Sequence, residues 1–87
     1  MTLPTIHLNG TSKEQLVAAL CSASYALDNA YAKLKETAPN GRDYYPQGQD
    51  AMPRARKEHD DRMRRLDGIK DEIDEMALAI DKIANRL

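Results

Sequence analysis

Two stretches of heptad-spaced apolar residues, separated by a segment that no helix can cross, constrain this chain most strongly. The separating segment, residues 39–50, reads PNGRDYYPQGQD and holds two prolines and two glycines. Pro39 lacks a backbone N–H and disfavours helical geometry in the residue before it, so a preceding helix must end there. Two helices joined in this way pack most simply as antiparallel neighbours. The sequence therefore predicts an all-α fold, an antiparallel two-helix hairpin with a long Pro/Tyr-rich connection.

The first helix is expected over residues 11–38. Its start offers two alternative capping boxes, Thr11 with Glu14 or Ser12 with Gln15. Apolar residues then recur at alternating spacings of four and three, the pattern of a coiled-coil seam. The seam consists of Leu16, Leu20, Ala23, Leu27, Ala30 and Leu34, and Val17, Cys21 and Tyr31 widen it. This apolar face has to pack against another helix.

The second helix is expected over residues 51–87, with Asp50 as its N-cap and Pro53 tolerated in its first turn. Its apolar stripe consists of Met52, His59, Leu66, Ile73, Ile80 and Leu87, seven residues apart, with Ala55, Ile69, Met76 and Ile83 at the partner positions. The helices differ in length, ~39 Å against ~54 Å. The longer one should overhang the shorter and expose Ile and Met, so we expect a homo-oligomeric helical bundle, a dimer or larger.

Residues 1–10 are predicted to form an extended arm. Ile6 and Leu8 alternate with Thr5 and His7, and Pro4 excludes a helix. A single strand cannot satisfy its own hydrogen bonds, so the arm either pairs with the same strand of a second copy or lies across a helix. At 87 residues, the whole chain is expected to form one domain.

Composition excludes several classes of protein. The 13 basic and 14 acidic residues give a net charge of −1, whereas a duplex nucleic-acid binder usually carries a basic excess. The chain has neither the apolar run of ~20 residues that crosses a membrane nor a secretory signal, so we expect a cytoplasmic protein. With one cysteine and no zinc-ligand spacing, no disulfide, metal site or cofactor is expected. No catalytic set is recognisable, and we expect a protein that is not an enzyme.

A candidate ligand site lies at the linker end of the hairpin. From Arg54 to Arg65 the second helix has six basic and three acidic residues. Arginine and lysine bind phosphate, and tyrosine stacks on a nucleobase. The expected ligand-binding residues are Lys33, Arg42, Tyr44, Tyr45, Arg54, Arg56, Lys57 and His59. The structural alternative is that the lysines complement a helix C-terminus, the arginines pair along their helix, the tyrosines pack the linker and His59 sets the oligomer register.

An acidic cluster on the second helix is a candidate magnesium site. Asp71, Glu72, Asp74 and Glu75 resemble the clusters that hold magnesium in all-helical nucleotide pyrophosphatases. Such enzymes need a second acidic cluster on a facing helix, where this chain has only three widely spaced acidic residues. A solvated acidic face is therefore the favoured interpretation.

The segments IHLNGTS (residues 6–12) and APNGRDYYPQG (residues 38–48) resemble a family of small uncharacterised all-helical proteins of tailed phages and prophages. The resemblance implies a phage setting and brings no assigned activity. Some phage proteins similar in size and type are oligomeric sponges for cyclic nucleotide immune signals. This favours a counter-defence protein that sequesters a nucleotide. The alternative is a coiled-coil adaptor or inhibitor that docks on a host or phage protein through Ile80 and Ile83.

Overall fold

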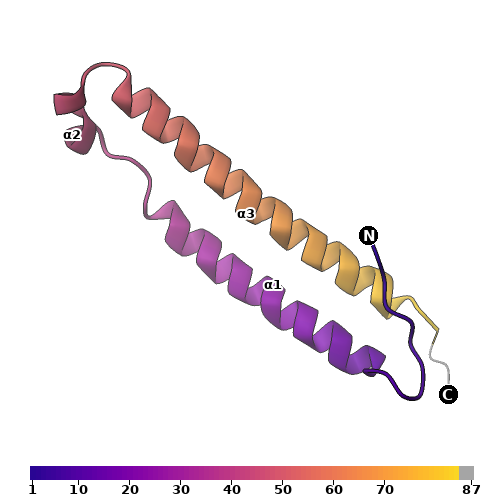
Figure 1. Ribbon diagram of the computed structural model, residues 1–87. Helices are drawn as coiled ribbons and strands as arrows, with labels where there is room; N and C mark the ends of the chain where they lie inside the picture. The colour runs from indigo at the N-terminus through magenta and orange to yellow at the C-terminus, as the bar shows by residue number, and fades with distance from the viewer. Residues whose placement is uncertain (85–87) are drawn as a thin grey trace.

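The computed structural model describes residues 1–84 as two long antiparallel helices (Figure 1). Helix α1 spans Lys13–Lys35 and helix α3 spans Ala51–Asp81, and they pack along their lengths. The linker between them contains the short helix α2, Gly41–Tyr44, and the 3₁₀ helix η1, Tyr45–Gln47. The described residues contain no strand, and the molecule measures 65 × 20 × 17 Å. The prediction of an all-α hairpin is confirmed.

Local hydrogen bonds set the two ends of α1. The Ser12 Oγ accepts from the backbone N–H of Gln15 at 3.1 Å, and the Gln15 side chain accepts from the Ser12 N–H at 3.3 Å. Of the two capping boxes predicted, this is the second, so α1 starts two residues later than expected. At the other end α1 stops at Lys35, three residues before its predicted end, and the Thr37 hydroxyl donates to the carbonyl of Leu34 at 2.6 Å.

The face of α1 that packs against α3 differs from the predicted seam. The four leucines of the predicted seam are half-buried as expected, as are Val17 and Tyr31, but Ala23 and Ala30 are exposed. The half-buried positions of α1 are Lys13, Leu16, Val17, Leu20, Ser24, Leu27, Tyr31 and Leu34. Cys21 is exposed as well, so it does not border the packed face.

A polar network on one side of the hairpin fixes the register of the two helices. The Ser24 hydroxyl donates to the Asp74 carboxylate, and the Lys70 ammonium donates to the same carboxylate at 2.8 Å. The Lys70 Nζ also lies 3.8 Å from Asp28 Oδ1. The hydrogen bond to Asp74 raises the pKa of Lys70, and the hydrogen bonds from Lys70 and Ser24 lower the pKa of Asp74. Residues 24 and 28 of α1 are thereby held opposite residues 74 and 70 of α3.

In this register the extra length of α3 lies at the linker end of the hairpin and not at the C-terminal end. Ala51, Ala55 and His59 are buried in the part of α3 that lies beyond α1, on the side covered by the linker. At the other end Ile80 is fully buried, and the Lys13 Nζ donates to the carbonyl of Ile83 at 2.9 Å. The predicted exposed overhang of Ile and Met residues is therefore wrong.

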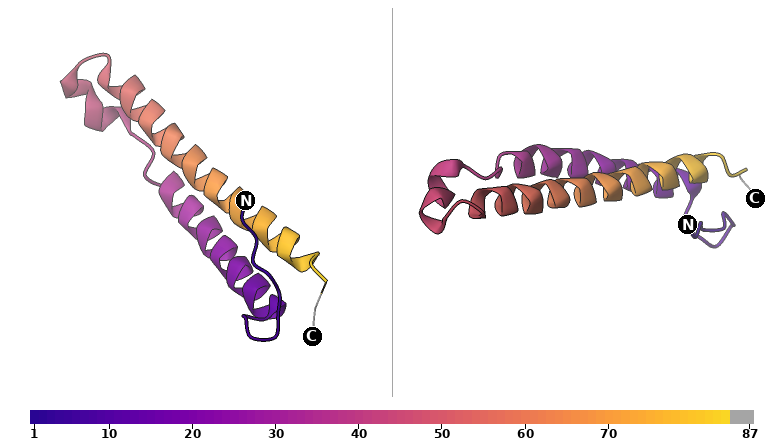
Figure 2. Two further views of the ribbon diagram at one scale, coloured as in Figure 1. Left: turned by 45° about the vertical axis from the view of Figure 1, so that its right-hand side comes forward. Right: turned by 90° about the horizontal axis from the view of Figure 1, so that it is seen from above.

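The arm that precedes α1 is extended and runs alongside the last turns of α3 (Figures 1 and 2). Ile6, in this arm, is only 7% exposed, and Ile80 in the last turn of α3 is fully buried. His7 and Gly10 form the turn back to α1, where a Cβ on residue 10 would lie 2.7 Å from the imidazole. In the single chain the arm lies alongside the end of α3, and its pairing with the arm of a second copy stays a prediction.

Helix α3 ends at Asp81, earlier than predicted, and Lys82–Ala84 follow it without helical structure. The expected extension to Leu87 lies partly outside the described residues. Neither α1 nor α3 is apolar enough over its described length to cross a membrane.

Candidate functional site

The linker folds into a compact tip at one end of the hairpin, and its sequence explains each turn. The Asn40 side chain caps α2 by accepting from the Arg42 N–H at 2.9 Å. Pro46 stands in the first turn of η1, where a missing N–H is tolerated. Gly48 follows with φ 102°, a conformation that strains any residue with a Cβ. The linker is therefore a built structure and not a flexible spacer.

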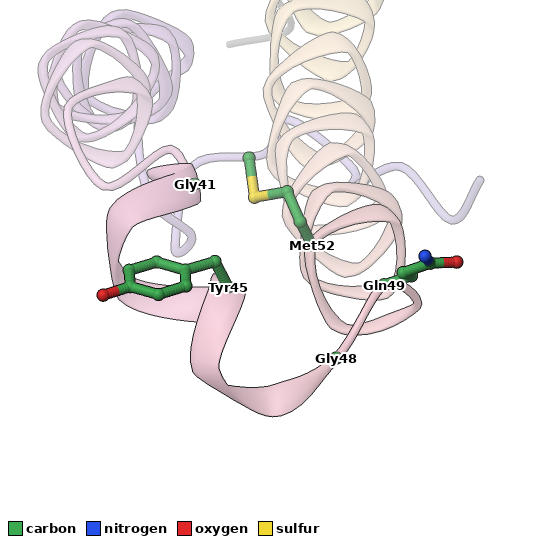
Figure 3. A pocket seen from close by; sticks show the side chains of 5 residues that line it. All are labelled: Gly41, Tyr45, Gly48, Gln49 and Met52. Atoms are coloured by element: carbon green, nitrogen blue, oxygen red, sulfur yellow. The ribbon is translucent and has the colours of Figure 1, made fainter.

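An open pocket of 360 Å³ lies at this tip. Its lining residues are Gly41, Tyr45, Gly48, Gln49 and Met52. Figure 3 shows the Met52 side chain reaching from α3 toward Gly41, while the Tyr45 ring extends away from α3. Tyr45 is 77% exposed and Tyr44 is half-buried, so of the two tyrosines predicted to stack on a ligand, Tyr45 has the accessible ring.

The N-terminus of α3 opens beside this pocket. Asp50 occupies the N-cap position, but within the described chain its side chain makes no capping hydrogen bond. The N–H groups of the first turn point out of a helix end and carry the positive end of the helix dipole. The first turn holds no acidic side chain, so the N–H groups of Ala51 and Met52 can favour an anion here, although Pro53 has no N–H and Asp50 at the N-cap is acidic.

The predicted basic residues do not all gather at the tip. Residues two apart on an α-helix point roughly 160° apart, so Arg54 lies on the opposite side of α3 from Met52. Arg56 follows Met52 by one turn on the same side of α3, and Lys57 points away from Met52 and Arg56. Arg42 lies on α2, beside the pocket residue Gly41. All four basic side chains are exposed.

Two further predicted site residues lie away from the pocket. In the observed register Lys33 stands level with Arg65, ~16 Å along α3 from Arg54, and it pairs with Glu36 at 3.6 Å. His59 is 6% exposed, which prevents its ring from contacting a ligand at the surface. Its Nδ1 has no hydrogen-bond partner within residues 1–84. The structure therefore does not bring Lys33 and His59 together with the other predicted site residues.

The glycines, Gln49 and Met52 of the pocket were missed by sequence reasoning, which looked for charge and aromatic rings. The one available signal was the pair of glycines that flank YYPQ, because such residues often mark tight turns where a ligand can approach the backbone. Another open hollow, lined by Asp61, Arg64 and Arg65, lies on α3 alone. Asp61 and Arg64 pair with each other there, and a single helix surface does not enclose a ligand.

The acidic cluster does not form a metal centre in the described part of the chain. No group of three or more His, Cys, Asp or Glu side chains lies close enough to hold a metal ion there. Asp74 is instead engaged by Ser24 and Lys70 across the helix interface. This carboxylate contributes to helix pairing.

Comparison of the chain with known protein families, with characterised proteins and with solved structures found no match.

Proposed function

We propose that this protein is a non-enzymatic phage accessory protein that sequesters a linear or cyclic nucleotide at the hairpin tip and acts as a cytoplasmic homo-oligomer. The resemblance of its two segments to proteins of tailed phages supports the setting. The observation that carries the ligand class is an exposed aromatic ring, Tyr45, beside an open pocket at the N-terminus of a long helix.

The chemistry of the tip suits the two halves of a nucleotide. A base that stacks on the face of Tyr45 gains ~1–3 kcal/mol. A phosphate at the first turn of α3 would meet the N–H groups of Ala51 and Met52 and the positive end of the dipole, and Arg42 and Arg56 add charge near it. The 360 Å³ pocket falls within the size range of small-molecule sites. Binding of this kind requires no general acid, base or metal.

A thermal-shift screen against linear and cyclic mono-, di- and trinucleotides, with and without magnesium, tests the proposal. A ligand present at 100 times its dissociation constant stabilises the fold by ~2.7 kcal/mol. For a domain of 87 residues this corresponds to a shift of roughly 15 °C. The ligand recovered after binding should be chemically intact, since turnover would indicate an enzyme.

The Tyr45→Ala variant then locates the site, and Tyr25→Ala is its matched control. Tyr25 lies on α1 and is 72% exposed, close to the exposure of Tyr45, but it is remote from the tip. We expect the tip variant to lose most of the shift and the control to keep it. Equal shifts in both variants would refute the proposed site.

The second candidate function is a coiled-coil adaptor or inhibitor that binds a host or phage protein. The exposure of Leu78 at 61% and Ile69 at 49% on α3 favours it, because both side chains offer apolar contact area. It no longer rests on Ile80, which is fully buried. Absence of a shift with every nucleotide in the screen, together with capture of a defined host or phage protein, would favour this candidate.

A further inference from the structure

The two flanks of the hairpin differ in chemistry. One flank, here called the polar flank, carries the network of Ser24, Asp28, Lys70 and Asp74 that links α1 to α3. This network satisfies its own charges within the chain. The opposite flank has no such network among the described residues, and it follows from the helix periodicity which residues lie there.

On α1, Asp28 lies on one side of the seam that faces α3, and the alanines at positions 23 and 30 lie on the other. On α3, Asp74 lies on one side of the line through Leu66 and Ile73, and Ile69 lies on the other. The flank opposite the polar network is here called the apolar flank. It consists of Ala19, Ala23, Ala26 and Ala30 of α1 with Ile69 and Met76 of α3.

The apolar flank is open in the single chain. Its four alanines are exposed, and Ile69 is 49% exposed. Alanine side chains let another helix approach closely, because they project only one carbon from the backbone. Such a face offers contact area at little cost in side-chain entropy.

The single chain buries too little surface for its size. Its accessible area is 6768 Å², whereas the surface scaling of compact monomers gives ~5,200 Å² for a chain of this mass. The buried apolar residues of the described chain are Ile6, Ala51, Ala55, Ala77 and Ile80, three of them alanine. The excess of ~1,600 Å² exceeds the ~800 Å² that each partner buries in a standard interface.

The charged residues along the apolar flank of α3 indicate which partner would dock there. Arg65 precedes Ile69 by four residues and Glu72 follows it by three, and both are exposed. Within the described residues neither side chain forms an ion pair. A two-fold axis through Ile69 would bring Arg65 of each copy opposite Glu72 of the other, whereas parallel copies would set like charges together.

We infer that a second copy of this chain docks antiparallel on the apolar flank, with Ile69 at the two-fold axis and Arg65 facing Glu72 of the partner subunit. The inference rests on the self-association in the proposed function and adds the surface, the orientation and the charge pair. It does not depend on any ligand.

Sedimentation equilibrium of the full chain without nucleotide tests the surface. We expect the wild type to dimerise and Ile69→Asp to dissociate at least tenfold more readily, because each dimer would bury two charges at its axis. Leu78→Asp is the matched control, since Leu78 is an exposed apolar residue of α3 outside the apolar flank. It should dimerise like the wild type, and helical circular dichroism should confirm that both variants fold.

A charge exchange tests the orientation. Arg65→Glu and Glu72→Arg should each weaken the dimer about tenfold, because each places two like-charge contacts across the axis. The double variant restores opposite charges and should recover most of the affinity. A monomeric wild type, an intact Ile69→Asp dimer or a double variant as weak as the single ones would overturn the inference. If the wild type forms the dimer but binds no nucleotide, the proposed ligand is refuted and the dimer surface is not.

Discussion

Substitution of Ile80 by alanine should destabilise the hairpin more than any comparable change near it. Ile80 lies in the last turn of α3, and none of its side chain is exposed. The arm crosses this end of α3, and Ile6 in the arm is buried as well. Few apolar side chains are fully enclosed in this narrow molecule, so each contributes a large share of its stability.

The expected loss is ~3 kcal/mol in the free energy of unfolding. Truncation of a buried isoleucine to alanine costs about 2–5 kcal/mol, and a site beneath an arm relaxes more than the centre of a core. The unfolding entropy of a chain of 87 residues is ~0.18 kcal/mol per kelvin. The midpoint of thermal unfolding should therefore fall by roughly 17 °C.

Thermal and urea unfolding followed by circular dichroism, at one chain concentration, measure this loss. Leu78→Ala is the control, because Leu78 is two residues away on the same helix and 61% exposed, and it should change stability by less than ~0.5 kcal/mol. Ile6→Ala should destabilise in the same direction as Ile80→Ala. If Ile80→Ala and Leu78→Ala cost the same, the arm does not seal this end of the hairpin and the reasoning is refuted.

Three smaller effects follow from caps, turns and charges. Ser12→Ala removes the capping box of α1 and should cost ~1 kcal/mol in urea unfolding; an unchanged midpoint would contradict the cap. Gly48→Ala should cost at least ~1 kcal/mol because of the positive φ, whereas Gly41→Ala, with open space and no such φ, should be close to neutral. The pKa of Asp74 is lowered in the folded state, so this group stabilises the fold above the ordinary carboxyl pKa, and the stabilisation is lost as pH falls through the folded pKa. The pKa of Lys70 is raised, so this group stabilises the fold below the ordinary lysine pKa, and the stabilisation is lost as pH rises through the folded pKa. Asp74→Asn should therefore weaken the dependence of the unfolding midpoint on pH below about 4, and identical acid profiles would refute the role of this pair.

Local features of the fold were predictable from the sequence, and features that depend on pairing were not. The capping box at Ser12 and the break at Pro39 rest on neighbouring residues, and both are observed. The seam of α1 was predicted from apolarity alone, which favours Ala23 over Ser24. The Ser24 hydroxyl is bonded to Asp74, fifty residues away, and one sequence cannot reveal that partner.

The misplaced overhang has the same origin. Helix lengths show that one helix must extend past the other, but the register decides at which end. That register depends on contacts between Lys70, Asp74 and the facing residues of α1, which are distant in sequence. The buried state of Ile80 follows from the register together with the position of the arm.

The structure has a pocket at the linker, where the sequence predicted a ligand site, and it brings only some of the predicted residues near that pocket. The tyrosines of the linker and the basic residues that follow it predicted a site at this end of the hairpin, and the pocket lies at the linker. Whether Tyr44 or Tyr45 is exposed depends on the phase of α2 and η1, which the sequence did not predict. The separation of Arg54 from Met52 follows from helix periodicity alone and could have been predicted. A shift of one residue in a helix start turns every side chain by about 100°, so the composition of a segment cannot specify which of its side chains converge.

A two-helix hairpin separates its functions by geometry. Two helices cannot enclose a cavity between them, so a ligand site has to form at an end and a partner site along a flank. An axis through Ile69 lies 18 residues from Ala51, which is ~27 Å along α3. The partner's α3 ends ~18 Å beyond that axis, so the end of this helix would not reach Ala51 of the first copy. The two tips of such a dimer would stand far apart at opposite ends, each open to its own ligand. Dimerisation and ligand binding would then be independent equilibria, and a variant that abolishes one should leave the other measurable.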